Sequence, residues 1–258
     1  MWITDLVVHD KENIPIWTGW NALSTHSSDL PVQKVWYLPQ INQSPTSNAV
    51  VMETMKRSSI LARECQKSSI AVTYDLAIAK IAMRIQENES PRFDNLFIAL
   101  GPFHEQMAFF SALGKYIAES GGPYILIESE VLASGSLNVF LKGKNFNRGK
   151  RVHGLLSAAM EAIHFDSFLS QLDNKEESIL ILSTELDKVR SRNNKDGIVF
   201  RNMELSKEAN EIMQNYLKYA KETTNGSHGK TAQFWYGYIN LMKTYRIFDR
   251  SIRVTFCN

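Results

Sequence analysis

The sequence predicts an α/β fold, a small mixed or parallel sheet with packed helices that continues into a mostly helical C-terminal region. Two observations predict it. Short apolar runs alternate with amphipathic segments up to residue 117, and after residue 122 the strand signals stop and helical periodicity remains. We therefore expect an α/β core in residues 1–123 and a helical region in residues 124–258.

The first expected element is a strand at residues 35–41, VWYLPQI, which a Ser-Pro-Thr-Ser turn separates from a helix in residues 47–66. A buried strand, SIAVTYD, follows at residues 69–75. The next helix carries apolar residues at i, i+3, i+4 and i+7 counted from Ile78, which is the pattern of a helix with one buried face.

A third strand is expected at residues 95–100, NLFIAL, and Gly101-Pro102 ends it. The helix that starts near Phe103 has apolar residues at alternating spacings of three and four, and the segment Ser120-Gly121-Gly122-Pro123 ends it. We expect the three strands to lie in one sheet, with the helices that begin near Leu76 and Phe103 packed on it.

Helical periodicity continues through the second half of the chain, with polar breaks between the periodic segments. The helices expected there cover residues 136–141, 147–169, 175–190, 205–221 and 230–252.

The composition limits the partners and the compartment. Lys and Arg together number 29 against 27 Asp and Glu, a net charge of +2, so only a local patch could attract nucleic acid or acidic lipid. Cys65 and Cys257 show no disulfide or zinc spacing, which favours reduced thiols. The N-terminal sequence lacks the pattern of a signal peptide. No uncharged run of about 18 apolar residues, as a membrane-spanning helix needs, occurs in the sequence. We expect an intracellular protein, nuclear or cytoplasmic, with no membrane partner.

Asp75 and His104 are the first candidate site residues, because Asp75 ends one predicted strand directly before a helix and His104 follows the next predicted strand after a short turn. Ligands of α/β proteins collect at the carboxyl ends of strands, where a carboxylate can hold a metal or a phosphate. The alternative for Asp75 is a helix N-cap, and for His104 a packed or capping residue in the first helical turn.

A polar face on the helix predicted at 147–169 is the second candidate. At about 100° per residue, His153, Ser157, Glu161 and His164 fall on one side, and we expect Val152, Leu156, Ala159 and Ile163 to line the core side. The polar side is either a solvated face or part of a site.

A basic cluster precedes that helix, five cations within ten residues. Such a cluster is able to hold a phosphate backbone, and surface clusters of this kind also occur without nucleic acid. Its members are Lys142, Lys144, Arg148, Lys150 and Arg151, with Phe146 among them.

The segment Gly229-Lys230-Thr231 resembles the end of a phosphate-binding P-loop. The motif also needs a glycine five residues before Gly229, where this chain has Thr224, and a preceding strand, where the pattern is helical. We therefore expect no nucleotide cofactor.

An ordered set of stretches along the chain resembles a family of uncharacterised open reading frames of animal genomes that derive from transposable elements. The set spans most of the chain and consists of IPIWTGWNALS, VWYLPQINQSPT, AVTYDLAIAKIA, LFIALGPFHEQMAFFSALG, LKGKNFNRGKRVHGLLSAAMEA and FWYGYINLMKTYRIFDRSIR.

Through its middle part the chain also resembles an RNase H-like transposase core, in which carboxylates hold two divalent metals for phosphodiester cleavage. The resemblance implies Asp75 as the second carboxylate, Glu161 as a third, His104 beside them, and Mg²⁺ as the metal if the site is active. Relatives carry the first carboxylate in an upstream Asp-Asn segment before the start of this chain, so Asp5, Asp10 or Asp29 would have to replace it.

Two function classes follow. The chain is a fragment of a mobile-element-derived transposase with an incomplete, inactive site, or it is a non-catalytic module that binds nucleic acid, DNA among the candidates, or another partner. We expect Asp75 and Glu161 to face one another across a cleft in the first case.

Overall fold

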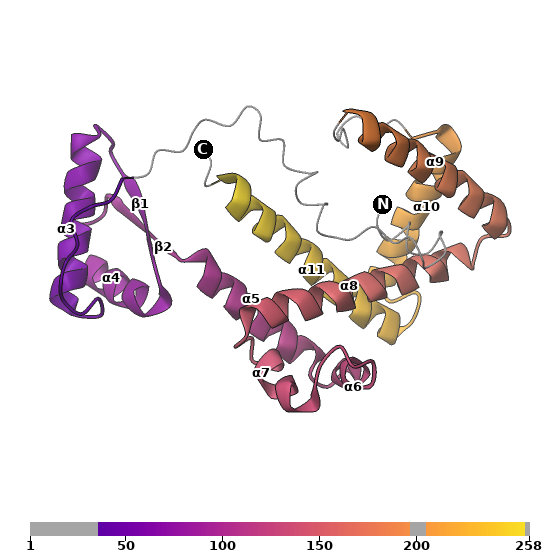
Figure 1. Cartoon of the computed structure of the whole chain (residues 1–258), viewed down its shortest axis with the longest axis horizontal. Coiled ribbons are helices and arrows are strands. Elements are labelled where there is room, and N and C mark those ends of the chain that lie inside the picture. The colour runs from indigo at the N-terminus through magenta and orange to yellow at the C-terminus, as the bar shows by residue number, and fades with distance from the viewer. Residues whose placement is uncertain (1–35, 197–204, 256–258) are drawn as a thin grey trace.

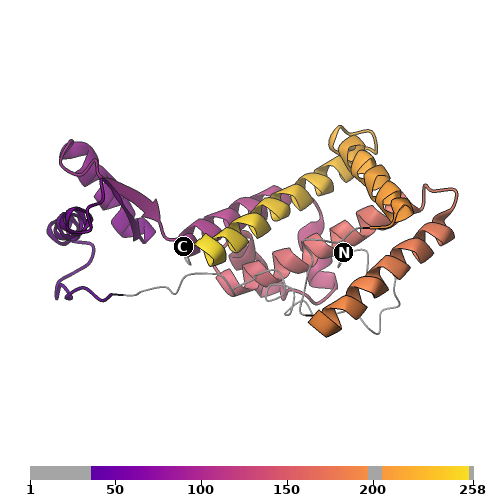
Figure 2. The same ribbon diagram turned by 90° about the horizontal axis from the view of Figure 1, so that it is seen from above.

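The computed structural model describes residues 36–196 and 205–255. Figures 1 and 2 show an elongated molecule with a small α/β unit at one end and a larger helical region along the rest of its length. The elements are α3 (Asn48–Glu64), β1 (Ile70–Tyr74), α4 (Leu76–Asn88), β2 (Leu96–Leu100), α5 (Pro102–Ile117), α6 (Gly122–Glu128), η2 (Ser134–Ser136), α7 (Leu137–Leu141), α8 (Phe146–Leu169), α9 (Lys175–Asp196), α10 (Lys207–Thr224) and α11 (Lys230–Thr255).

The α/β unit is built around two parallel strands. β1 pairs with β2 in the register Ile70 to Leu96 through Tyr74 to Leu100, and α4 forms the crossover between them. The apolar side chains that alternate along both strands pack with α3 and α4 around Met55, Phe93 and Leu96. The prediction that these two strands lie in one sheet is confirmed, and their pairing is parallel.

The opposite face of this sheet carries no packed helix from the described residues. Ala71 and Thr73 are exposed there, and the Phe97 side chain is 69% exposed. Parallel sheets are normally covered on both faces, so this unit has a smaller core than its topology usually provides.

The strand predicted at residues 35–41 is wrong over its described part. Residues 36–41 are irregular, and Trp36 and Tyr37 are 83% and 95% exposed. Pro39 has no backbone N–H to give to a ladder, and its carbonyl instead accepts a hydrogen bond from Arg57 Nη1 at 3.2 Å. Val35, Asp5, Asp10 and Asp29 lie outside the described residues.

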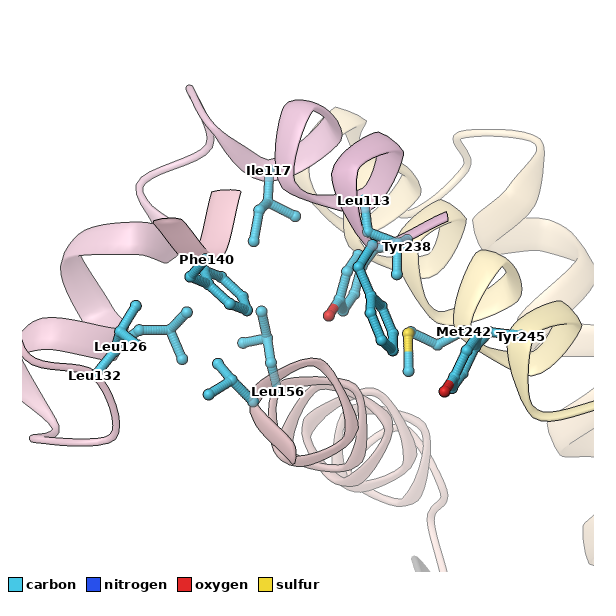
Figure 3. Close-up of a cluster of buried hydrophobic side chains, with 11 residues drawn as sticks. Leu113, Ile117, Leu126, Leu132, Phe140, Leu156, Tyr238, Met242 and Tyr245 are labelled. Atoms are coloured by element: carbon cyan, nitrogen blue, oxygen red, sulfur yellow. The ribbon is translucent and has the colours of Figure 1, made fainter. Parts of the chain in front are cut away.

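α5 belongs to the helical region, which corrects the prediction that it packs on the sheet. Its buried residues Phe110, Leu113 and Ile117 lie in one core with side chains from α7, α8 and α11. Figure 3 shows Leu113, Ile117, Phe140, Leu156 and Tyr238 pointing toward one another between these helices. The packing therefore changes near Gly101, earlier in the chain than the expected boundary at residue 123.

The later helices agree with the predicted segments, and the chain is predominantly helical with a small parallel sheet. α6 was not predicted, because seven residues give too short a run for periodicity to show. A second core joins α8 to α9 and α10 around Phe165, Leu169 and Ile212.

Candidate nucleic-acid interface

Asp75 follows β1 and begins α4. Its Oδ1 accepts a hydrogen bond from the backbone N–H of Ile78 at 2.9 Å, and its side chain is exposed. The carboxylate is therefore the N-cap of α4, one of the two roles that the sequence left open.

His104 lies at the same edge of the sheet as Asp75. The Gly101 N–H donates to the Tyr74 carbonyl at 2.7 Å, so the chain turns into α5 beside the residue that precedes Asp75. The His104 ring is half-buried and contacts the Phe103 ring edge-on, with the centroids 5.5 Å apart. The structure brings these two predicted residues to one edge.

Glu161 lies within the helical region and is 4% exposed. Its Oε1 accepts hydrogen bonds from Arg246 Nη1 at 2.8 Å and from Ser157 Oγ at 3.1 Å. Arg246 comes from α11, so this cluster joins the two longest helices of the helical core.

The structure does not bring Asp75 and Glu161 together. Asp75 caps a helix of the α/β unit, whereas Glu161 lies on α8, and Figures 1 and 2 show the two elements well apart. One carboxylate is engaged by a backbone N–H and the other by a guanidinium. The two residues do not fit a shared Mg²⁺ site in this arrangement.

The polar side of α8 is buried, which corrects both the idea of a solvated face and the expected orientation of the helix. His153 lies between the rings of Phe110 and Phe140, and its Nδ1 forms a hydrogen bond with the Tyr238 hydroxyl at 2.9 Å. Ala159 and Ile163, expected in the core, are exposed, while Val152 and Leu156 are buried as expected.

His164 continues this buried side toward α10. Its two ring nitrogens form hydrogen bonds with the Tyr216 hydroxyl at 3.1 Å and with Thr223 Oγ1 at 3.0 Å. Burial, together with the charges of Lys243 and His228, lowers the pKa of His164 to about 4. Burial likewise lowers the pKa of His153 to about 3, with a backbone hydrogen bond to Phe110 opposing the effect.

The basic cluster lies on the surface where α7 leads into α8. Lys142, Lys144, Arg148 and Arg151 are exposed, and none of the four forms an ion pair within the described residues. Lys150 differs, because its Nζ lies 2.7 Å from Asp249 Oδ1.

The loop that carries the first two lysines is held against α5. Gly143 has φ +64, and a Cβ there would lie 2.6 Å from the Met107 carbonyl oxygen and from the Ser111 nitrogen. Only glycine combines a positive φ with the absence of a Cβ that would clash with α5. Asn145 then caps α8 by accepting from the Arg148 N–H at 3.1 Å, so the cations are presented from an ordered turn.

Aromatic rings adjoin the same surface. Phe146, the first residue of α8, lies with its ring centroid 5.0 Å from that of Phe103, and Lys150 Nζ lies 5.9 Å above the Phe146 ring. Sequence reasoning placed Phe103 on the apolar side of its helix, yet it is 50% exposed. Local periodicity carries no signal for this contact, because the two rings are 43 residues apart in the chain.

A hollow of about 560 Å³ lies elsewhere, between the end of α5 and the first turn of α11, and contains none of the candidate residues. Lys230 and Thr231 line it. The element before Gly229 is the helix α10, in agreement with the helical pattern that argued against a P-loop.

None of the described helices is long and apolar enough to cross a membrane. Within residues 36–196 and 205–255, no three His, Cys, Asp or Glu side chains are grouped so that they would hold a metal ion.

A family model described as a domain of unknown function, DUF8702, matches residues 16–256. No curated protein and no solved structure matches the chain.

Proposed function

This chain belongs to the DUF8702 family, and we propose that it is a non-catalytic module that binds nucleic acid through the basic surface at the entrance to α8. The observation that supports the proposal most is the group of four exposed cations, Lys142, Lys144, Arg148 and Arg151, none paired with a carboxylate of the described residues. Each such cation that meets a phosphate releases a condensed counterion, which makes the binding favourable and sensitive to salt.

The N-terminus of α8 strengthens this surface. The first turn of a helix carries a partial positive charge, and α8 contains 24 residues, with the Arg148 N–H already bonded to the Asn145 cap. Its first turn contains Arg148 and no acidic residue. Phosphate oxygens would therefore meet the side-chain cations and the helix end on the same side.

The proposal does not include catalysis by these residues. Two-metal cleavage requires carboxylates that converge on both metals, whereas Asp75 caps α4 and Glu161 pairs with Arg246. An origin in a mobile element, which the sequence resemblance suggests, is compatible with a surface that binds DNA and has no active metal site.

Replacing Lys144, Arg148 and Arg151 together with alanine is expected to flatten the salt dependence of duplex DNA binding. Each lost phosphate contact lowers the slope of log K against log salt by about 0.9, so the triple variant should lose about 2 to 3 of that slope. Fluorescence anisotropy with one labelled duplex, titrated between about 50 and 200 mM salt, measures it.

The matched control removes three exposed lysines from α10, namely Lys207, Lys218 and Lys221. This variant has the same net charge as the first, so it separates a local contact from a general charge effect. An equal loss of slope in both variants would refute the assignment of this surface. No binding by the wild-type chain at low salt, to this duplex or to single strands, would refute the proposed function.

The purified chain is expected to show no magnesium-dependent nuclease activity. A supercoiled plasmid incubated with the chain and Mg²⁺ should keep the same nicking rate as with Mg²⁺ alone, because Asp75 and Glu161 do not share a site. The control is Asp75→Ala. Cleavage by the wild-type chain that disappears in this variant would contradict both the expectation and the non-catalytic proposal.

A further inference from the structure

Phe103 presents an aromatic face at the surface and packs against two aromatic neighbours. One side of its ring packs on Phe146 with an interplanar angle of 51°, and the His104 ring contacts it at 81°. Half of the side chain nevertheless remains exposed. A ring that is supported from behind loses little conformational entropy when a second flat group stacks on it.

Two of the exposed cations are close in sequence to Phe146, which contacts this ring. Lys144 and Arg148 are each two residues from Phe146 in the chain, and two residues span at most about 7 Å of backbone. Phe146 in turn contacts Phe103. A positively charged track beside a stacking ring is the arrangement by which proteins bind single-stranded nucleic acid.

We infer that this surface selects single-stranded over duplex nucleic acid, with one unpaired base stacked on Phe103 while Lys144 and Arg148 contact the adjoining phosphates. The inference rests on the proposed function and adds the class of nucleic acid. In a duplex the bases are already paired and stacked, so a protein ring at the surface gains nothing from them unless a base leaves the stack.

The charges around Phe103 define the path of the bound nucleic-acid strand. Asp75 ends β1 as the N-cap of α4 and Glu105 lies in the first turn of α5, whereas the exposed cations lie on the turn into α8 and in its first two turns. Phosphates are repelled by the carboxylates and attracted to the cations. The backbone of the strand therefore follows the turn that leads into α8, and its base points back toward Phe103.

The test compares three labelled probes at one salt concentration with the full chain, namely a 20-nucleotide oligo-dT, the matching oligo-U and a 20-base-pair duplex. We expect wild-type affinity to be higher for the single strands than for the duplex. Phe103→Ala should weaken single-strand binding at least about five-fold and change duplex binding less than about two-fold. Phe103→Trp should retain single-strand binding, because it keeps an aromatic face.

Two further variants sharpen the result. Phe97→Ala removes another exposed phenylalanine, on the bare face of the sheet, and should change neither affinity. Phe103→Leu keeps apolar contact with Phe146 and loses the aromatic face. If Phe103→Ala unfolds, this variant therefore still tests whether stacking on Phe103 contributes to single-strand binding. Oligo-dT and oligo-U together show whether DNA, RNA or both are accepted.

Equal wild-type affinity for single strands and duplex, with no effect of Phe103→Leu, would overturn the inference and leave the proposed function standing. A Phe103→Leu variant that weakens both probes equally would also overturn it, since Phe103 would then only support the basic surface. Absence of binding to all three probes would instead refute the proposed function.

Discussion

Lowering the pH from 7 to 5 is expected to remove about 4 kcal/mol from the free energy of unfolding through His153 and His164 alone. Burial holds the pKa of these two side chains at about 3 and about 4, whereas an unfolded histidine has a pKa of 6.5. Both residues are therefore neutral in the fold at pH 5, and the unfolded chain gains protons.

The direction of the effect follows from which state binds more protons. The stability that depends on these histidines is complete above pH 6.5 and is lost as the pH falls from there toward 4 and 3. Each histidine contributes about 1.4 kcal/mol per pH unit inside that window.

Urea unfolding of the wild-type chain and of His153→Gln at pH 7, 6 and 5 measures this contribution. The variant should lose about 2 kcal/mol less than the wild type between pH 7 and 5, because one titrating group is gone. Carboxylates that titrate in both proteins cancel in the difference. Identical pH dependence of the two proteins would show that His153 is not held neutral by the fold.

Gly114→Ala is expected to destabilise the helical region by about 3 kcal/mol or more. Gly114 lies in α5, where a Cβ would be 2.1 Å from the carbonyl oxygen of Leu141 and 2.6 Å from its carbonyl carbon. Both are backbone atoms of α7, so no side-chain rotation relieves the clash and the two helices must separate.

Gly154→Ala is the matched control, the same substitution inside another helix. No atom lies within 4 Å of the Cβ that it would add, so the variant should be about 0.8 to 1 kcal/mol more stable than the wild type. The difference between the two variants in urea or thermal unfolding tests the close contact of α5 with α7. A Gly114→Ala variant as stable as the wild type would contradict that contact.

The sequence was informative where local chemistry decides the structure. The β1-α4-β2 unit was predicted because a buried strand, an Asp cap and an amphipathic helix follow one another from Ile70 to Asn88. The N-cap of α4 was one of the two roles that the sequence left open for Asp75, the other being a metal or phosphate ligand. By contrast, the apolar and aromatic content of residues 36–41 predicted a strand, but the segment is irregular. Pro39 has no backbone N–H for a strand ladder, and this disfavours a strand there.

The buried polar side of α8 could not be predicted from α8 itself. Its spacing placed His153, Ser157 and Glu161 on one side correctly, but burial of that side depends on Tyr238 and Arg246 of α11. These partners are 85 residues away in each case, and no local pattern links them. The same holds for Phe103 and Phe146, whose contact creates the stacking surface.

The bare face of the two-stranded sheet affects how the chain as a whole responds to denaturant. The α/β unit has its own small core around Met55 and Phe93, and no buried residue of that core recurs in the main helical core. Regions with separate cores open as separate cooperative units, and the one that buries less apolar surface opens at lower free energy. Amide protons of β1 and β2 should therefore exchange sooner than those of α5 and α8. The unfolding energies of the histidine and glycine variants then belong to the helical unit.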